Sequence, residues 1–186
     1  MGLDMVLERR IYVKNSEFTK KPQRYQITVE QGGKPCKDID ADRISYLVEE
    51  IGCWSEANHI HKWFVEYVQS GVDDQREYPV YREQQTEDDQ RRGLDHLLWL
   101  CESVISASEL VPVKGKEEKG LKIANPTVAM KYLPTYKKRG KEYYFGSRAY
   151  DEIYLAHCQE TVRIINDAFV YWAWDTEWEV YYRASW

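Results

Sequence analysis

The stretch LDMVLERRIYV, Leu3 to Val13, decides the fold class. Apolar and polar side chains alternate along it, and a period of two over this length predicts a β-strand with one buried face. We therefore expect the chain to enter a sheet with this strand. The face expected to be buried carries Leu3, Met5, Leu7, Ile11 and Val13, and the other face carries Asp4, Glu8, Arg10, Tyr12 and Lys14.

Two further stretches alternate in the same way. Residues 24–30 do so until Gly32 and Gly33 interrupt the pattern, and we expect this strand to pair antiparallel with the first. Residues 177–183 alternate at the other end of the chain, which predicts a last strand.

Helical spacing of apolar residues predicts three helices between these strands. The first begins at a cap, Asp40 or Asp42, and covers residues 44–68, with Gly52 as a bend or a break. The second lies around residues 94–105. The third covers roughly 148–170, with Ser147 as its cap. The third helix is expected to bury Tyr150, Ile153, Tyr154, Ile164 and Ala168, with His157 on or near the same stripe.

This order of elements predicts an α+β fold. Strands at both ends with helices between them indicate a mainly antiparallel sheet, including the N- and C-terminal strands, with about three helices packed on it. A length of 186 residues suits one globular domain over residues 1–186. Polar composition predicts exposed loops at 114–120 and 137–142.

Composition restricts the class of protein. The opening MGLDMVLERR lacks the charged and apolar regions of a signal peptide, and no apolar run reaches the roughly 18 residues of a membrane helix. The 4 cysteines form no CxxC pair, so reduced thiols are expected rather than disulfides or a zinc site. These features predict a cytoplasmic protein, in the host cell cytoplasm if a phage encodes it, with no membrane partner, metal or cofactor.

The best candidate for a site lies in WSEANHIHKWF, Trp54 to Phe64. Helical spacing from Trp54 to Val65 places Asn58 and His61 on the buried stripe and His59, Lys62 and Glu66 on the solvent side. Side chains at i and i+3 are neighbours, and each can donate and accept hydrogen bonds.

Two interpretations of Asn58 and His61 stay open. Beside an acid such as Asp4, Asp73 or Asp74, His61 could act as a general base, which makes His61, Asn58 and Asp73 catalytic candidates. Alternatively, both are buried polar groups that found partners. A metal site at His59 and His61 is disfavoured, because residues i and i+2 of a helix point in nearly opposite directions.

Two other segments could bind charge. Gly146, Ser147 and Arg148 offer backbone N–H groups, a hydroxyl and a guanidinium at a helix start, which is a candidate anion site; an ordinary capped helix is the alternative. Residues 73–77 could hold a cation or form a solvated turn.

Charge is unevenly distributed along the chain. The net charge is −5, yet residues 131–148 carry six basic groups against Glu142 alone. We expect this segment to be an exposed contact for an acidic partner, protein or nucleic acid. Its partner-binding candidates are Lys137, Lys138, Arg139 and Lys141.

Several blocks together resemble an uncharacterised family of short proteins from bacteria and their phages. That family opens Met-Gly-Leu-Asp-Met-aromatic-Leu and ends Tyr-Arg-Ser-Ser-Trp; here Val6 replaces the aromatic residue and Ala184 a serine. The blocks are MGLDMVL, ANHIHKWF, DDQREYPV, YYFGSRAYDE and YYRASW. The resemblance implies a phage or mobile-element context and brings no activity with it.

Three functions remain from the sequence. The first is an interaction protein that binds and modulates a host protein, with inhibition of a nucleoprotein defence complex such as a CRISPR effector as the expected case. The second is a small enzyme or a nucleotide- or phosphate-binding domain that uses His61 and Asn58. The third is nucleic-acid binding through residues 131–148. The lack of any strong catalytic motif favours a protein that is not an enzyme.

Overall fold

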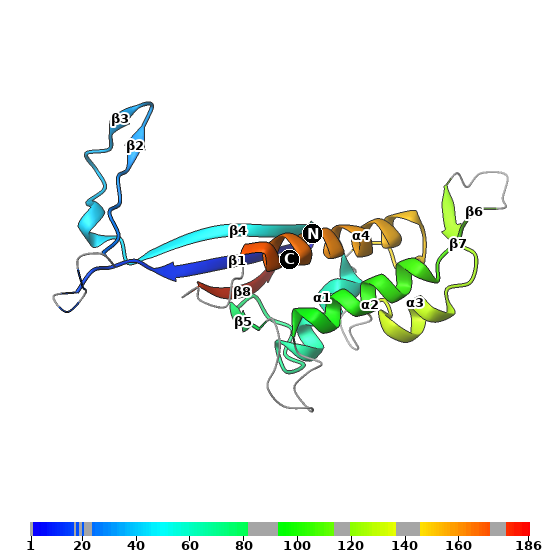
Figure 1. Cartoon of the computed structure of the whole chain (residues 1–186). Helices are drawn as coiled ribbons and strands as arrows, with labels where there is room; N and C mark the ends of the chain where they lie inside the picture. The colour runs from blue at the N-terminus through cyan, green and yellow to red at the C-terminus, as the bar shows by residue number, and fades with distance from the viewer. Residues whose placement is uncertain are drawn as a thin grey trace.

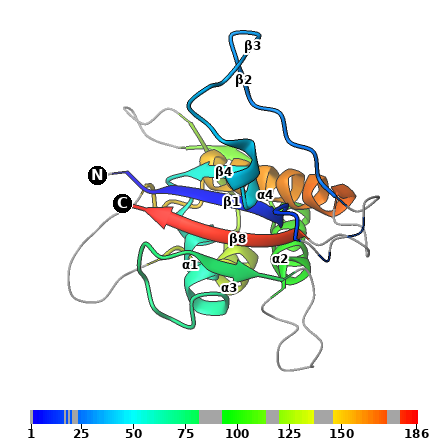
Figure 2. The same cartoon turned by 90° about the vertical axis from the view of Figure 1, so that its left-hand side faces the viewer.

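The computed structural model describes residues 2–16, 18, 20, 24–81, 93–113, 120–136, 146–171 and 178–186. Its centre is a four-stranded antiparallel sheet in the order β4-β1-β8-β5 (Figure 1). The strands are β1 (Asp4–Tyr12), β4 (Tyr46–Ser55), β5 (Tyr78–Val80) and β8 (Trp178–Ser185). The helices gather on one side of the sheet (Figure 2), so the predicted α+β fold with N- and C-terminal strands in one sheet is confirmed.

The alternation at the two ends of the chain becomes the core of the sheet. Met5 and Leu7 of β1 are buried, as are their partners Ala184 and Tyr182 on β8. Burial of apolar area is the main favourable term in folding, so the central β1–β8 pair anchors the domain. The opposite face of β1 carries Glu8, which binds Arg10 and Arg183 in a charged network on the open face of the sheet.

The predicted helix over residues 44–68 is wrong in its first half. Residues 46–55 form β4, which pairs with β1 over nearly its whole length, and helix α1 (Asn58–Tyr67) begins only after it. The spacing of apolar residues at 44–51 fits a helix, but pairing with β1 supplies a full ladder of backbone hydrogen bonds and overrides the local pattern. Asp40 caps a shorter element, the 3-10 turn η2 (Ala41–Arg43).

Gly52, expected to bend a helix, instead lets a helix approach the sheet. A Cβ at this position would lie less than 3.0 Å from the Ile164 side chain of helix α4 (Glu152–Tyr171). Glycine therefore sets the separation between β4 and α4.

The predicted strand over residues 24–30 does not pair with β1. The two edges of β1 are occupied by β4 and β8, so no edge is left for it. Only β2 (Glu30–Gln31) pairs, with β3 (Lys34–Pro35), through the positive-φ residues Gly32 and Gly33. This hairpin is the tip of an arm, made of the described residues between Val13 and Ser45, that projects away from the sheet and helices (Figure 1).

The remaining elements complete the helical layer. Helix α2 (Leu94–Ser106) confirms the second predicted helix, and α4 confirms the third. Helix α4 begins at Glu152, and its cap is Asp151, whose carboxylate accepts a hydrogen bond from the backbone N–H of Tyr154. Ile153, expected to be buried, is exposed, because it lies at the start of α4 on the side away from the core. The short elements are α3 (Thr127–Tyr132), β6 (Leu110–Pro112) and β7 (Leu121–Ile123).

One cluster of buried apolar side chains joins these elements. It runs from Met5 and Leu7 on the sheet through Phe64 of α1 to Leu97 of α2 and Ile165 of α4. The predicted loop 137–142, and 114–120 apart from Gly120, lie outside the described residues.

Candidate functional site

A sharp turn between β4 and α1 positions the polar residues that the sequence singled out. Glu56 has φ 57°, a conformation that residues other than glycine seldom adopt, and the backbone N–H of Asn58 donates to the Glu56 carbonyl at 2.9 Å. The chain thus changes from strand to helix within two residues. Asn58 and His61 are buried at the start of α1, as predicted.

Asn58 ties α1 to two other segments. Its side-chain amide donates to the Ser147 carbonyl at 3.1 Å, and its side-chain oxygen accepts from the backbone N–H of Tyr136 at 3.4 Å. Asn58 therefore joins, at one point, the segments before α4 and after α3.

His61 lies at the middle of a chain of hydrogen bonds. The Asp73 carboxylate can only accept, so the proton on Nε2 of His61 donates to Oδ1 at 3.2 Å, and Nδ1 accepts from the Tyr182 hydroxyl at 2.7 Å. The second oxygen of Asp73 accepts from the hydroxyl of Tyr136 at 3.1 Å. We call Tyr136, Asp73, His61 and Tyr182 the His61 relay.

Burial controls the protonation of the relay tyrosines. Burial and the neighbouring Asp73 raise the pKa of Tyr136 to about 12. The same two causes, with burial again the larger, raise the pKa of Tyr182 well above its usual value. Both hydroxyls therefore keep their protons at neutral pH and act as donors.

The His61 relay places a base next to an orienting acid, as general-base sites do, but it lies inside the core. His61 and Tyr182 are fully buried, and Tyr182 stacks on Phe64 with ring centroids 3.7 Å apart. A substrate could reach Tyr182 only if the core opened. In this conformation the relay serves chiefly to hold α1, β8 and the segment after α1 together.

The structure also separates the three acids considered for His61. Asp73 is the partner, whereas Asp4 accepts from the hydroxyl of Ser55 and Asp74 binds Arg76 and Tyr78. Within residues 73–77, Asp73 therefore faces inward, whereas Asp74 and Arg76 form an ion pair within the turn.

His59, expected on the solvent side of α1, is buried, and that prediction is wrong. Its ring lies 4.0 Å from the Tyr154 ring and its Nε2 lies 3.7 Å from Sγ of Cys158, both on α4. Helix α1 is covered by α4 as well as by the sheet, so most of its circumference is buried. The sequence of α1 itself contains no pattern that predicts its contact with α4.

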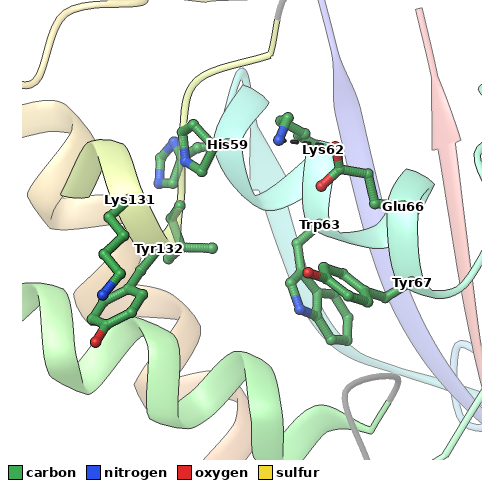
Figure 3. Close-up of a pocket in the computed structure, with 9 residues that line it drawn as sticks. His59, Lys62, Trp63, Glu66, Tyr67, Lys131 and Tyr132 are labelled. Carbon is green, nitrogen blue, oxygen red and sulfur yellow. Dashed lines mark ion pairs between the residues drawn. The ribbon is translucent and has the colours of Figure 1, made fainter. Parts of the chain in front are cut away.

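Two cavities adjoin His59. Figure 3 shows the first, of about 150 Å³, where His59, Lys62 and Trp63 of α1 face Lys131 and Tyr132 of α3. Lys62 is paired with Glu66 at 2.9 Å, and the Lys131 ammonium lies over the Tyr132 ring at 5.1 Å. The charged groups at this cavity thus already have partners.

The second cavity, of about 230 Å³, lies between the β4–α1 turn and the start of α4. Its lining residues are Ser55, Glu56, His59, Ser147, Ala149, Asp151, Ile153, Tyr154 and His157. The sequence did not indicate His157 or Tyr154 as site residues, because each sits on a stripe that reads as core.

Of the candidate anion-binding residues, Ser147 lines this second cavity, and Gly146 and Arg148 are its neighbours in the sequence. Gly146 has φ 67°, and the Ser147 hydroxyl accepts from the backbone N–H of Ala149 at 3.0 Å. Arg148 is exposed. Since Asp151 caps α4, part of the N–H array at that helix start is already used by the protein's own carboxylate.

The structure gives no support for the other predicted sites. Lys137, Lys138, Arg139 and Lys141 lie outside the described residues. Within the described ranges, no group of three or more His, Cys, Asp or Glu side chains is arranged to hold a metal ion. None of the helices formed by the described residues is long and apolar enough to cross a membrane.

Comparison of the chain with known protein families, with curated protein sequences and with solved structures finds no match.

Proposed function

We propose that this chain is an interaction protein that recognises a partner protein through its arm and the adjoining end of strand β4. The observation that supports this most is a set of large apolar side chains that are exposed along the arm and at the adjoining ends of β1 and β4. Monomeric proteins seldom keep such a group without a use for it. Its members, each at least a third exposed as a residue, are Tyr12, Phe18, Tyr25, Ile39, Tyr46, Leu47 and Val48.

The backbone of β4 supports the same proposal. In the described part of the chain β4 pairs only with β1, so its other edge is available over ten residues from Tyr46 to Ser55. An open, partly apolar edge strand is a template for a strand from another chain. We infer that the partner contributes an extended segment that adds to β4.

The side chains around this edge define the chemistry of that segment. The rings of Tyr12 and Tyr46 meet edge to face at 5.1 Å, and Val48 is exposed beside them, which favours apolar side chains in the partner. Glu50 is also exposed, whereas Glu49 is paired with Arg9. A basic residue opposite Glu50 would complement the surface.

The identity of the partner is a further step in the proposal. The resemblance to short bacterial and phage proteins suggests a host protein, and a defence complex such as a CRISPR effector is the class that we would examine first. This step rests on the resemblance, whereas the binding surface rests on the exposed residues.

The binding surface is tested by photo-crosslinking in bacterial cells. A benzophenone amino acid at Val48 should give a discrete adduct, and the same amino acid at Met130, which is equally exposed on α3, should not. Tyr46→Lys and Leu47→Lys should abolish the Val48 adduct while leaving the melting temperature nearly unchanged, since both side chains are exposed. Equal adducts from Val48 and Met130, or none from Val48, would refute the proposal.

A second candidate, a small enzyme or ligand-binding domain built on His61 and Asn58, is supported by one observation. The Asp73–His61 pair has the geometry of a base held by an acid. Its test is the comparison of stability with activity described in the Discussion.

A further inference from the structure

The second cavity has a floor of two buried rings and a rim of two carboxylates. His59 and Tyr154 are each only 3% exposed. Glu56 enters from the β4–α1 turn, and Asp151 from the start of α4. The cavity is therefore formed by two segments nearly a hundred residues apart.

Buried His59 lacks a full set of partners. Its Nε2 contacts Sγ of Cys158 at 3.7 Å, and the described residues give the ring no other hydrogen bond. Fully buried side-chain N or O atoms without a partner are confined, within the described residues, to Nε of Arg10 and Oε1 of Gln69. Nδ1 of His59 thus keeps some accessible surface, and the ring lines both this cavity and the one beside α3, so a bound molecule can supply the missing partner.

The lining groups are rich in acceptors. Asp151 and Glu56 bring negative charge, and the Glu56 carboxylate makes no hydrogen bond or ion pair with the described residues. No lysine or arginine lines this cavity within the described chain.

The aromatic groups complement the carboxylates. Tyr154 lies against His59, and the ring of His157 stacks beside His59 with centroids 5.7 Å apart. The face of a tyrosine ring such as Tyr154 attracts cations, and carboxylates in a partly enclosed site strengthen that preference.

We propose that the cavity between Glu56 and Asp151 binds a small organic cation, a primary amine or a guanidinium group. The two carboxylates receive its N–H groups, and the rings of His59 and Tyr154 form the floor beneath it. A cavity of about 230 Å³ accommodates the end of a basic side chain or a free diamine of similar size. This site is separate from the arm and from the His61 relay.

Titration by NMR of the full chain, labelled at histidine, tests the proposal. Agmatine and butylamine are the cationic probes; butyrate and inorganic phosphate are the anionic controls. The ring resonances of His59 and His157 should shift in a saturable manner with agmatine or butylamine, with Kd in the millimolar range expected for so few contacts. They should not respond to butyrate or phosphate at the same concentrations.

Three variants separate the site from a general effect of charge. Glu56→Gln and Asp151→Asn should each weaken agmatine binding about tenfold, since each removes a charged partner. Asparagine caps a helix as well as aspartate does, so Asp151→Asn keeps the start of α4 intact. Glu102→Gln, an equal change of charge at an exposed position on α2, should leave the affinity unaltered.

Melting temperatures of all variants show whether they are folded. No saturable shift with either cationic probe would overturn the proposal. So would tighter binding of butyrate or phosphate, or an equal loss of affinity in Glu102→Gln and in the two cavity variants.

Discussion

The His61 side chain and the hydroxyl of Tyr182 meet at 2.7 Å, although 121 residues separate them in the chain. One belongs to α1 and the other to the last strand, so this hydrogen bond joins the helical layer to the sheet. It lies at the centre of the core, where an unsatisfied polar atom is costly.

Tyr182→Phe should therefore destabilise the fold. The substitution keeps the ring stacked on Phe64 but leaves Nδ1 of His61 without its donor, at a cost of about 1–3 kcal/mol. The melting temperature should fall by several degrees, because about 1 kcal/mol shifts a domain of this size by roughly 2–4 °C. Calorimetry measures the change. Tyr181→Phe is the matched control: its hydroxyl bonds the exposed Glu179, and its loss should have little effect.

His61→Ala distinguishes core from site. A structural role predicts a similar fall in melting temperature, with any loss of function following the loss of folded protein. A variant that melts like the wild type but fails in function would instead favour the enzymatic or ligand-binding alternative. Asn58→Ala should behave as His61→Ala does, because it leaves the Ser147 carbonyl and the Tyr136 N–H without a partner.

Gly146→Ala should be strongly destabilising for two reasons. Gly146 has φ 67°, and a Cβ there would lie less than 3.0 Å from the carbonyl oxygen of Glu56. Gly33→Ala measures the effect of the positive φ alone, because Gly33 has φ 74° and a Cβ there would contact nothing. This substitution should cost about 1 kcal/mol. Urea unfolding of both variants gives the contribution of the contact by difference. Equal losses of unfolding free energy in the two variants would show that the turn at Glu56 moves to make room for the new methyl group.

Gly52 and Ile164 should be energetically coupled. Gly52→Ala places a methyl group against Ile164 and should cost about 1–3 kcal/mol through overpacking. Ile164→Ala should cost about 2–5 kcal/mol alone, through the cavity it leaves. The double variant should be more stable than the sum of the two losses predicts, by at least about 0.5 kcal/mol in a double-mutant cycle. Strict additivity would mean that β4 and α4 do not pack as described.

Stability should fall as the pH drops from 7.5 to 5.5. Burial lowers the pKa of His59 well below 6.5, and the neighbouring His157 lowers it further; burial also lowers the pKa of His157 despite the opposing effect of Asp151 and Glu56. The unfolded chain therefore binds more protons than the folded chain below about pH 6.5, so protonation favours unfolding. Urea unfolding at the two pH values measures the effect. His157→Gln should flatten the dependence, and a pH-independent free energy of unfolding would contradict this account.

The strands near the two ends of the sequence could be predicted because alternating apolar and polar residues there fit a β-strand and do not fit a helix. Strands β1 and β8, which form there, each have one apolar face and share a core. Residues 44–51 were ambiguous, because their apolar positions fit a helical stripe while their actual partner, β1, lies far away in the sequence. In β4, residues 46–50 are exposed and Ile51 is only partly buried, so the apolar pattern there is a poor guide to burial.

The site could be predicted in part. The phase of α1 placed Asn58 and His61 correctly, and Asp73 was among three acids that sequence could not rank. Tyr182 and Tyr136 were not foreseen as partners, since tyrosines on strands and loops are common. His59 was misplaced because its burial depends on α4, which packs on α1 from almost a hundred residues away.

The β1–β8 pairing has a consequence for how the protein is made. Strand β1 is synthesised first, yet its neighbour β8 consists of residues 178–185. Until those residues leave the ribosome, the nascent chain has Met5 and Leu7 without their partners and an unpaired edge beside them. Such intermediates are prone to aggregate. The four-stranded sheet can therefore close only after β8 has been synthesised, and the eight residues of that strand set the earliest point at which this core is complete.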